Sequence, residues 1–355
     1  MSPTSIFRFP SLRLPGGLIL FLLLISASPV APAGPGGEGT ASEKEKLASL
    51  FQKDRVTIAV TDSGLGGMSV VAEAVRKTKE ARIFKRADFV FFNALFSNEG
   101  GYNSLKTREE KILVFDSALA SLERRFRPDV ILIGCNTLSV LTNDTQFSKQ
   151  TKVPVVGIVD SGVELIATEL GEHPEASVII FGTPTTISEG TYQERLMKQG
   201  FPAGRIQAQS CPELESYIEN DPRSDETGML ISGFVSEAVQ GLSSPPPPLL
   251  VSLNCTHYGY SLGSWEGAFE EAGIKPLALL NPNSRLGDVL VSREYAGRTK
   301  KTEVTVKAVS MVDISRQKVD SLAPWLERVS PETAEALRRI DHQPSLFEWK
   351  RYVNR

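Results

Sequence analysis

Residues 56–70 read VTIAVTDSGLGGMSV and contain a strand signal, a polar turn and the start of a helix in immediate succession. The run VTIAV at 56–60 is rich in β-branched residues, which favours a strand. It leads to Asp62 and Ser63, and the glycines within 64–67 then permit a tight turn. An apolar strand that enters a helix through such a loop is typical of a parallel α/β sheet.

The same alternation of short apolar runs and helical stretches continues along the chain. Further strands are predicted at FVFF (89–92), VILIG (130–134), VPVVGIV (153–159), SVIIFG (177–182) and LLVSL (249–253). Apolar residues at helical spacing predict helices at 69–79, 108–125, 191–199 and 226–240. Continuous apolar strands separated by helices indicate an α/β fold with mainly parallel sheets that are covered on both faces.

Two strand-to-loop junctions repeat at nearly the same offset, which indicates a duplicated lobe. Thr183, after SVIIFG, lies 121 positions beyond Asp62, and Cys255, after LLVSL, lies 120 positions beyond Cys135, after VILIG. In open α/β sheets, ligands bind beyond the carboxyl ends of the strands. We therefore expect two pseudo-symmetric α/β lobes, with these four residues around an active site in the cleft between them.

The first 33 residues carry the pattern of a secretory signal peptide. Arg8 and Arg13 precede the apolar run LILFLLLISA at 18–27, and small residues at 31–33 suit a cleavage site. We expect an exported protein, periplasmic or secreted. An uncleaved membrane anchor is the alternative, although the run is short for a hydrocarbon core of roughly 30 Å.

Composition and charge exclude several classes of protein. The 39 Lys and Arg nearly balance the 42 Asp and Glu, and no basic run interleaved with aromatic residues occurs, so a nucleic-acid partner is not expected. Three cysteines are too few for a disulfide framework. They are therefore apolar core residues, metal ligands or reactive thiols.

Two of the cysteines stand where catalytic groups are expected. Cys135 and Cys255 each follow a predicted buried strand and precede hydrogen-bonding residues, whereas Cys211, in Ser-Cys-Pro, lacks that setting and is assigned to the core. Two thiols on opposite sides of a substrate can remove a proton from one face of a carbon and return one to the other. We expect a helix N-terminus to lower their pKa values, with Asp62 assisting Cys135 and His257 assisting Cys255.

Three other interpretations of these motifs remain open. A hydrolase could use one cysteine as a nucleophile with His257 and an aspartate, although the second cysteine would then have no role. A metal could bind Cys255-x-His257, but His173 and His342 lie outside any ligand-like cluster in the sequence, and we expect no metal. The glycines after Asp62 weakly match a nucleotide fingerprint, and a tight turn is the favoured interpretation.

The motifs together resemble those of glutamate racemases, in the aspartate/glutamate racemase superfamily. The matching stretches are Asp62-Ser63-Gly64-Leu65-Gly66-Gly67-Met68-Ser69-Val70, Cys135-Asn136-Thr137, Gly182-Thr183-Pro184 with Thr186, Gly190-Thr191-Tyr192-Gln193-Glu194, Cys211-Pro212 and Cys255-Thr256-His257-Tyr258. Aspartate racemases typically carry Glu after the second Cys-Thr, so His257 favours the glutamate side. The resemblance covers residues 56–283 and extends to a strand near 304–312.

The resemblance implies a cofactor-independent amino-acid racemase, an isomerase, that interconverts L-glutamate and D-glutamate, which in this family supplies D-glutamate for peptidoglycan and the cell wall. The implied catalytic residues are Cys135, Cys255, Asp62, His257 and Glu219, and Glu219 could equally be a solvated carboxylate at a helix end. The implied substrate-binding residues are Asp62, Ser63, Asn136, Thr137, Thr183, Thr256 and His257. The implied partner is a small amino acid; a homodimer is compatible with the sequence, which does not decide the oligomeric state.

Departures from the family pattern leave the substrate open. Asn93-Ala94 and Gly101-Tyr102-Asn103 replace the family's Asp-Thr and Pro-Tyr-Gly in a substrate-binding loop. The alternatives are a racemase or isomerase of another small dicarboxylate, aspartate or a hydantoin on the same scaffold, and an inactive exported binding protein. The expected organisation is a signal peptide at 1–33, a linker at 34–53, a first lobe at 54–156, a second at 157–261, a return to the first at 262–315 and a helical C-terminal extension at 316–355.

Overall fold

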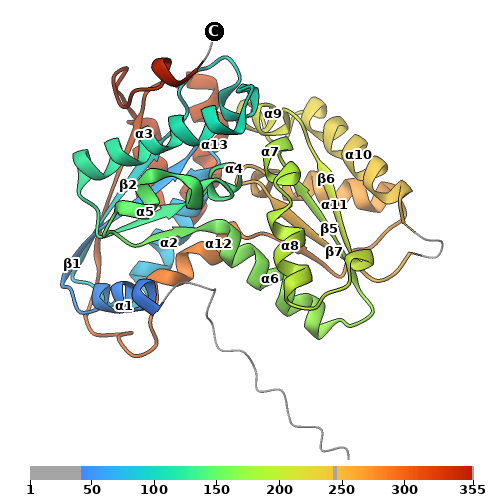
Figure 1. The fold of residues 1–355 in the computed structure, drawn as a ribbon, viewed down its shortest axis with the longest axis horizontal. Helices are drawn as coiled ribbons and strands as arrows, with labels where there is room; N and C mark the ends of the chain where they lie inside the picture. Colours follow the sequence, from blue (N-terminus) through green and yellow to red (C-terminus); the bar gives the residue numbers. More distant parts are fainter. Residues whose placement is uncertain (1–40, 243–245, 354–355) are drawn as a thin grey trace, which may run out of the picture. The chain divides into compact units, whose positions relative to one another are not determined.

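A computed structural model of the protein describes residues 41–242 and 246–353, and two parallel sheets organise this part of the chain (Figure 1). The first sheet has the order β10-β9-β2-β1-β3-β4 and consists of β1 (Arg55–Asp62), β2 (Arg86–Asn93), β3 (Val130–Ile133), β4 (Val155–Gly157), β9 (Glu303–Ser310) and β10 (Asp341–His342). The second has the order β6-β5-β7-β8 and consists of β5 (Ser177–Gly182), β6 (Ile206–Ser210), β7 (Leu249–Asn254) and β8 (Ala278–Leu280). The α/β class with parallel sheets is confirmed.

The second sheet repeats the topology of the first. The order β2-β1-β3-β4 recurs as β6-β5-β7-β8, so that β5 corresponds to β1 and β7 to β3. Cys135 and Cys255 follow the corresponding strands β3 and β7, and Asp62 and Thr183 stand at the ends of β1 and β5. The topology therefore supports the duplication that the sequence offsets predict.

Helices cover both faces of each sheet. The α-helices of the described residues are α1 (Ala41–Leu50), α2 (Gly67–Ala81), α3 (Arg108–Phe126), α4 (Asn136–Ser139), α5 (Gln146–Gln150), α6 (Ile158–Glu172), α7 (Pro184–Ser188), α8 (Thr191–Lys198), α9 (Leu214–Asn220), α10 (Asp225–Gln240), α11 (Leu262–Glu271), α12 (Asn283–Leu286), α13 (Arg316–Val329) and α14 (Pro331–Arg338). Figure 1 shows α6 and α8 on one side of the second sheet, and α10 and α11 on the other.

Alternate residues of each strand enter different cores, as the pleat requires. In β1, Ile58 and Val60 share a core with residues of α2 and α13, while Ala59 packs with residues of α3. In β5, Phe181 packs with Trp265 of α11, while Ile180 packs with residues of α6 and α8. Because both faces are buried, the strands read as continuous apolar runs.

The structure corrects two predicted elements in the first half of the chain. The segment 34–53 is not simply a linker, because α1 occupies part of it and Leu50 is buried in the core of the first sheet. The run VPVVGIV at 153–159 is mostly not a strand: β4 covers only 155–157, and Ile158 already begins α6. In both places, tertiary packing overrides the local composition.

The later boundaries also differ from the prediction. The return to the first lobe does not begin at residue 262, because α11 packs against α10 and β8 pairs with β7 in the second sheet. The C-terminal segment 316–355 contains α13 and α14, as predicted, but it also adds β10 to the edge of β9. It is therefore an integral part of the first sheet's layer.

The signal peptide predicted at 1–33 lies outside the described residues. Within the described ranges, the structure contains no helix of the length and apolar character that a membrane span requires.

Candidate active site

Cys135 stands where β3 ends and α4 begins, and it is 5% exposed. Its Sγ lies 3.1 Å from Ser63 Oγ, in the loop after β1. Burial raises the pKa of the Cys135 thiol to about 12, and the negative charge of Asp62 contributes to the rise. The prediction that a helix N-terminus lowers the pKa of Cys135 is therefore wrong. Desolvation of the thiol outweighs the effect of the backbone amides of α4, which has only four residues.

Cys255 occupies the corresponding place after β7 and is also 5% exposed. Its Sγ lies 3.6 Å from His257 Nδ1. Burial is the largest cause that raises the pKa of Cys255 well above its usual value, and the negative charge of Glu215 is the second. The charges of Cys135 and Asp62 raise it by smaller amounts. The two thiols and Asp62 thus share one electrostatic environment, although they come from different sheets.

Asp62 links the two sheets through its side chain. It is 1% exposed, and its Oδ2 accepts a hydrogen bond of 2.8 Å from Thr256 Oγ1, beyond the end of β7. Burial raises the pKa of Asp62 to about 6, against the opposing effects of the positive charge on His257 and the hydrogen bond from Thr256. Asp62 therefore titrates close to neutral pH.

His257 and Glu219 form a buried pair beside Cys255. His257 Nε2 lies 2.8 Å from Glu219 Oε1, and both side chains are almost completely buried. Burial lowers the pKa of His257, but the hydrogen bond to Glu219 and the negative charge of Glu219 outweigh this effect. The pKa of His257 is therefore raised. Burial opposes ionisation of Glu219 as well, yet its hydrogen bond to His257, together with the charges of His257 and Lys318, lowers its pKa to about 2. Glu219 is therefore not a solvated carboxylate.

The glycine-rich loop after β1 lies directly against this pair. Leu65 N donates to Glu219 Oε1 at 2.5 Å, and Gly66 N lies 3.0 Å from His257 Nε2. A Cβ atom on Gly66 would lie 2.7 Å from His257 Nδ1, closer than real Cβ contacts allow. The glycines thus permit the close approach of two loops, which supports the tight-turn interpretation over a nucleotide fingerprint.

The predicted substrate-binding threonines and Asn136 lie at adjoining strand ends. Thr137 Oγ1 is 2.8 Å from Thr183 Oγ1, across the two sheets. Asn136 Oδ1 accepts a hydrogen bond of 2.6 Å from Tyr192, and its buried Nδ2 has no hydrogen-bond partner among the described residues. A buried amide donor without a partner is suited to an anionic oxygen.

Two residues beside the site, Glu215 and Lys318, were missed by the sequence reasoning, and a third, Asn103, was named only as part of the altered loop. Asn103, in the altered loop, accepts from Thr185 at 2.7 Å, and its Nδ2 lies 3.4 Å from Glu215 Oε1. The other oxygen of Glu215, Oε2, is buried without a partner among the described residues. Lys318 of α13 binds Glu219. The altered loop was the one sequence signal for these residues, and it contains only Asn103 of the three.

The altered loop has a different role at its start. Asn93 is fully buried, and its Nδ2 donates to Ser310 Oγ of β9 at 3.1 Å, so it joins two strands of the first sheet. Tyr102 is buried, stacks edge-on against Phe96, and has its pKa raised by burial and then by the charge of Cys135. Tyr102 therefore packs within the electrostatic reach of Cys135.

All three cysteines are free thiols, and Cys211 is fully buried in the core, as predicted. Contrary to the prediction, His173 lies in a ligand-like cluster. Ligand atoms of His173, Glu169 and Glu172 lie within 4.8 Å of one another at the end of α6. His173 and Glu172 are exposed, and among the described residues no hydrogen bond or ion pair joins the group to a candidate catalytic residue, so we do not assign it to this site.

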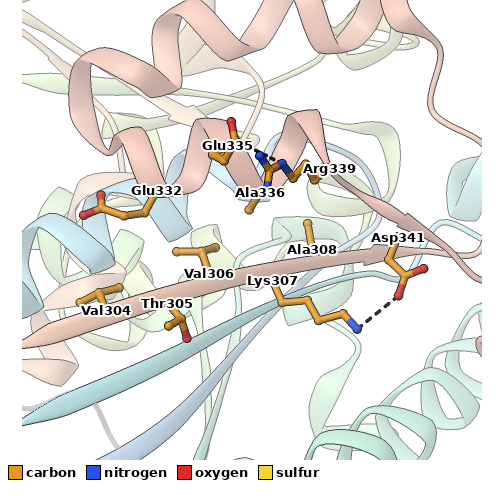
Figure 2. Close-up of a pocket in the computed structure, with 10 residues that line it drawn as sticks. All are labelled: Val304, Thr305, Val306, Lys307, Ala308, Glu332, Glu335, Ala336, Arg339 and Asp341. Carbon is orange, nitrogen blue, oxygen red and sulfur yellow. Dashed lines mark ion pairs between the residues drawn. The ribbon is translucent and has the colours of Figure 1, made fainter.

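A separate groove of about 340 Å³ lies between β9 and α14 (Figure 2). Four of its five charged side chains pair with one another: Lys307 Nζ lies 3.2 Å from Asp341 Oδ2, and Arg339 Nε lies 2.5 Å from Glu335 Oε1. The fifth, Glu332, pairs with Lys79 outside the groove. None of the predicted site residues lines this groove. The candidate active site is therefore the group around Cys135 and Cys255.

Known proteins resemble this chain in sequence. A family model described as Asp/Glu/Hydantoin racemase matches residues 68–241. The glutamate racemase of Clostridium botulinum is 27% identical over 210 residues, which cover 59% of this chain and 74% of that protein. That segment spans most of the relative's length.

Solved structures show the same fold. Glutamate racemase from Bacillus anthracis superposes with a TM-score of 0.62 at 18% identity, covering 82% of this chain and 99% of that one. Glutamate racemase from Francisella tularensis, solved in complex with D-glutamate, superposes with a TM-score of 0.58 at 20% identity, and the match covers 82% of this chain and 96% of that one. The chain is therefore similar in sequence to members of the Asp/Glu/Hydantoin racemase family, and it shares the fold of solved glutamate racemases.

Proposed function

We propose that this protein racemises an amino acid, with glutamate as its main substrate, through Cys135 and Cys255 and without a cofactor. The observation that carries the proposal is the placement of the two cysteines. Both are buried at corresponding strand ends of a duplicated fold, and the charge of one affects the pKa of the other. The names of the relatives, which are glutamate racemases, support the choice of substrate.

In this mechanism, one cysteine removes the α-proton as a thiolate and the other returns a proton as a thiol from the opposite face. Because the charge of Cys135 raises the pKa of Cys255, ionising one thiol favours a protonated partner. The raised pKa values require a positive group to stabilise the thiolate. The ammonium group of the substrate, next to Asp62, is suited to this role.

Each cysteine has its own assistants. Asp62 and Ser63 lie beside Cys135, whereas the ion pair of His257 and Glu219 lies beside Cys255. Nδ1 of the His257 ring can donate to the Cys255 thiolate, because Nε2 is directed at Glu219 and at the Gly66 amide. Asn136, Thr137, Thr183 and Thr256 would hold the carboxylate and ammonium groups of the substrate.

Incubation with L- or D-glutamate in deuterated water tests the proposal. Two-base racemisation should place deuterium at the α-position of the product enantiomer while the optical rotation decays to zero. Intact rotation with glutamate, aspartate and other acidic amino acids would overturn the amino-acid racemase assignment. Binding measured by calorimetry without isotope exchange would indicate a binding protein instead.

One observation favours a second substrate class, a hydantoin or another small compound with N–H groups. Glu215 places a buried, unpartnered carboxylate oxygen close enough to Cys255 to raise its pKa. A negative charge there opposes an anionic side chain and favours a hydrogen-bond donor. In Glu215→Gln, a lower KM for glutamate would support glutamate as the substrate, whereas a loss of hydantoin turnover alone would favour the second class.

We also propose that the protein is exported and acts on amino acids outside the cytoplasm. The support is the pattern at residues 1–33, with two arginines before an apolar run and small residues at the expected cleavage site. Cell fractionation combined with N-terminal sequencing tests this proposal. A mature chain that begins after residue 33 in the exported fraction is expected, and a cytoplasmic chain with residues 1–33 intact would contradict it.

A further inference from the structure

The C-terminal helix α13 reaches the pair beside Cys255 with one basic side chain. Lys318 Nζ lies 2.7 Å from Glu219 Oε2, although the two residues are 99 positions apart in the sequence. The Lys318 side chain is 24% exposed and the Glu219 side chain 7%. The contact is thus an ion pair shielded from solvent on the carboxylate side.

The contacts continue from Glu219 to Cys255. Glu219 uses Oε2 for Lys318 and Oε1 for His257 Nε2, at 2.8 Å, and the opposite ring nitrogen of His257 faces the Cys255 sulfur at 3.6 Å. Each group therefore fixes the orientation of the next. The four side chains form a chain of contacts from the C-terminal segment to a proposed catalytic thiol, which we call the Lys318 relay.

A second contact from the same helix reaches the same loops. The ring of Trp325 packs edge-on against that of Tyr260, with centroids 4.9 Å apart. The Tyr260 hydroxyl donates to the backbone oxygen of Leu65 at 3.3 Å, within the glycine-rich loop. Helix α13 thus contacts Glu219 directly and also supports, through Tyr260, the glycine-rich loop that contains Leu65.

We infer that Lys318 is a positioning residue for Cys255, acting through Glu219 and His257. The inference rests on the proposed function, since it assigns the Lys318 relay to one of the two proposed bases. Lys318 gives the second oxygen of a buried carboxylate a charged partner, so that Glu219 stays ionised and its other oxygen stays directed at His257. Cys135 has no contact in this relay and has Ser63 and Asp62 instead.

Removing the ammonium group should loosen the relay rather than abolish the fold. Without Lys318, Glu219 Oε2 is a buried acceptor without a donor, and the carboxylate either takes a proton or turns toward solvent. In both cases His257 loses its fixed acceptor. The His257 ring is then no longer held where its Nδ1 can donate to the Cys255 thiolate.

The test compares Lys318→Met with the wild-type chain by alkylation. Iodoacetamide is added at pH 8, and the rates at Cys255 and Cys135 are followed by peptide mass spectrometry. We expect the rate at Cys255 to fall about fivefold while the rate at Cys135 changes less than about twofold, because only the former thiol depends on the Lys318 relay. Lys318→Arg should restore most of the Cys255 rate.

Arg316→Met is the matched control. It removes a cation from the same helix, but within the described part of the chain Arg316 pairs only with Asp320, and its side chain is 83% exposed. This variant should leave both alkylation rates and turnover unchanged. An unchanged Cys255-to-Cys135 rate ratio in Lys318→Met, or an equal fall at both thiols, would overturn the inference.

Turnover provides the second measurement. In Lys318→Met, kcat for glutamate should fall about tenfold with little change in KM, because Lys318 acts through Glu219 and is not one of the proposed substrate-binding residues. If the wild-type chain racemises nothing, the proposed function fails, and the alkylation ratio still decides whether the Lys318 relay acts on Cys255. If the Cys255-to-Cys135 alkylation ratio changes in Lys318→Met but the wild-type chain has no turnover, Lys318 still positions Cys255 and the proposed racemisation is rejected.

Discussion

Thr256 Oγ1 donates a hydrogen bond of 2.8 Å to Asp62 Oδ2, and this contact joins the loop after β7 to the end of β1. The two residues are 194 positions apart and both are almost completely buried. A buried carboxylate that titrates near pH 6 is therefore held by a residue adjacent to Cys255. Both proposed halves of the reaction depend on this contact.

Thr256→Val should destabilise the protein and raise the pKa of Asp62 further. The substitution keeps the shape but removes the donor, and a buried acceptor without its donor costs about 1–3 kcal/mol in the free energy of unfolding. Urea denaturation at pH 7.5 measures this loss. Thr305→Val, which removes a similar bond to Asp88 at an exposed position, should change stability by less than about 0.5 kcal/mol. Equal losses in both variants would contradict the expectation.

Asp62→Asn should stabilise the fold while abolishing racemisation. The folded pKa of Asp62, about 6, is raised from 3.8, so its favourable contribution is present below pH 3.8 and is lost as the pH rises through 6. Above that pH, the ionised carboxylate costs up to about 3 kcal/mol, which the neutral amide avoids. Denaturation at pH 7.5 and pH 5 should show a smaller gain at pH 5. A pH-independent difference would argue against the raised pKa.

Cys135→Ala and Cys255→Ala should each reduce racemisation by more than about 1,000-fold, because neither thiol can replace the other on the opposite face of the α-carbon. Cys211→Ala is the matched control, since Cys211 is equally free and buried but lies in the core. It should lose about 1 kcal/mol of stability and keep its turnover. Polarimetry measures the activity, and a fully active Cys135→Ala or Cys255→Ala variant would exclude the two-base mechanism.

Gly66→Ala should lose activity by about 100-fold or more, because its Cβ would force His257 away from Cys255. The comparison is Gly171→Ala in α6, where a Cβ meets no atom within 4 Å. That variant should be active and more stable by roughly 0.5–1 kcal/mol, since alanine favours helix over glycine. A fully active Gly66→Ala would show that the close approach is not needed.

Whether a strand could be predicted from the sequence depended on how apolar its own residues are. The runs that became β1, β5 and β7 are apolar on both faces, so their strand character follows from composition. The strand β6, with the sequence IQAQS, is half-buried throughout and lacks that signal. The two-residue strand β10 exists only because it pairs with β9. Such elements depend on neighbours that are distant in the sequence.

By itself, the sequence determined the α/β class, the duplicated lobes and the positions of Cys135 and Cys255, since strand composition and repeat offset are written along the chain. Only the tertiary structure decided how the site residues are tuned. Burial raises the pKa values of both thiols, and Lys318 reaches Glu219 from 99 positions away. Desolvation and long-range ion pairing depend on what surrounds a group in three dimensions, and no local pattern encodes that environment.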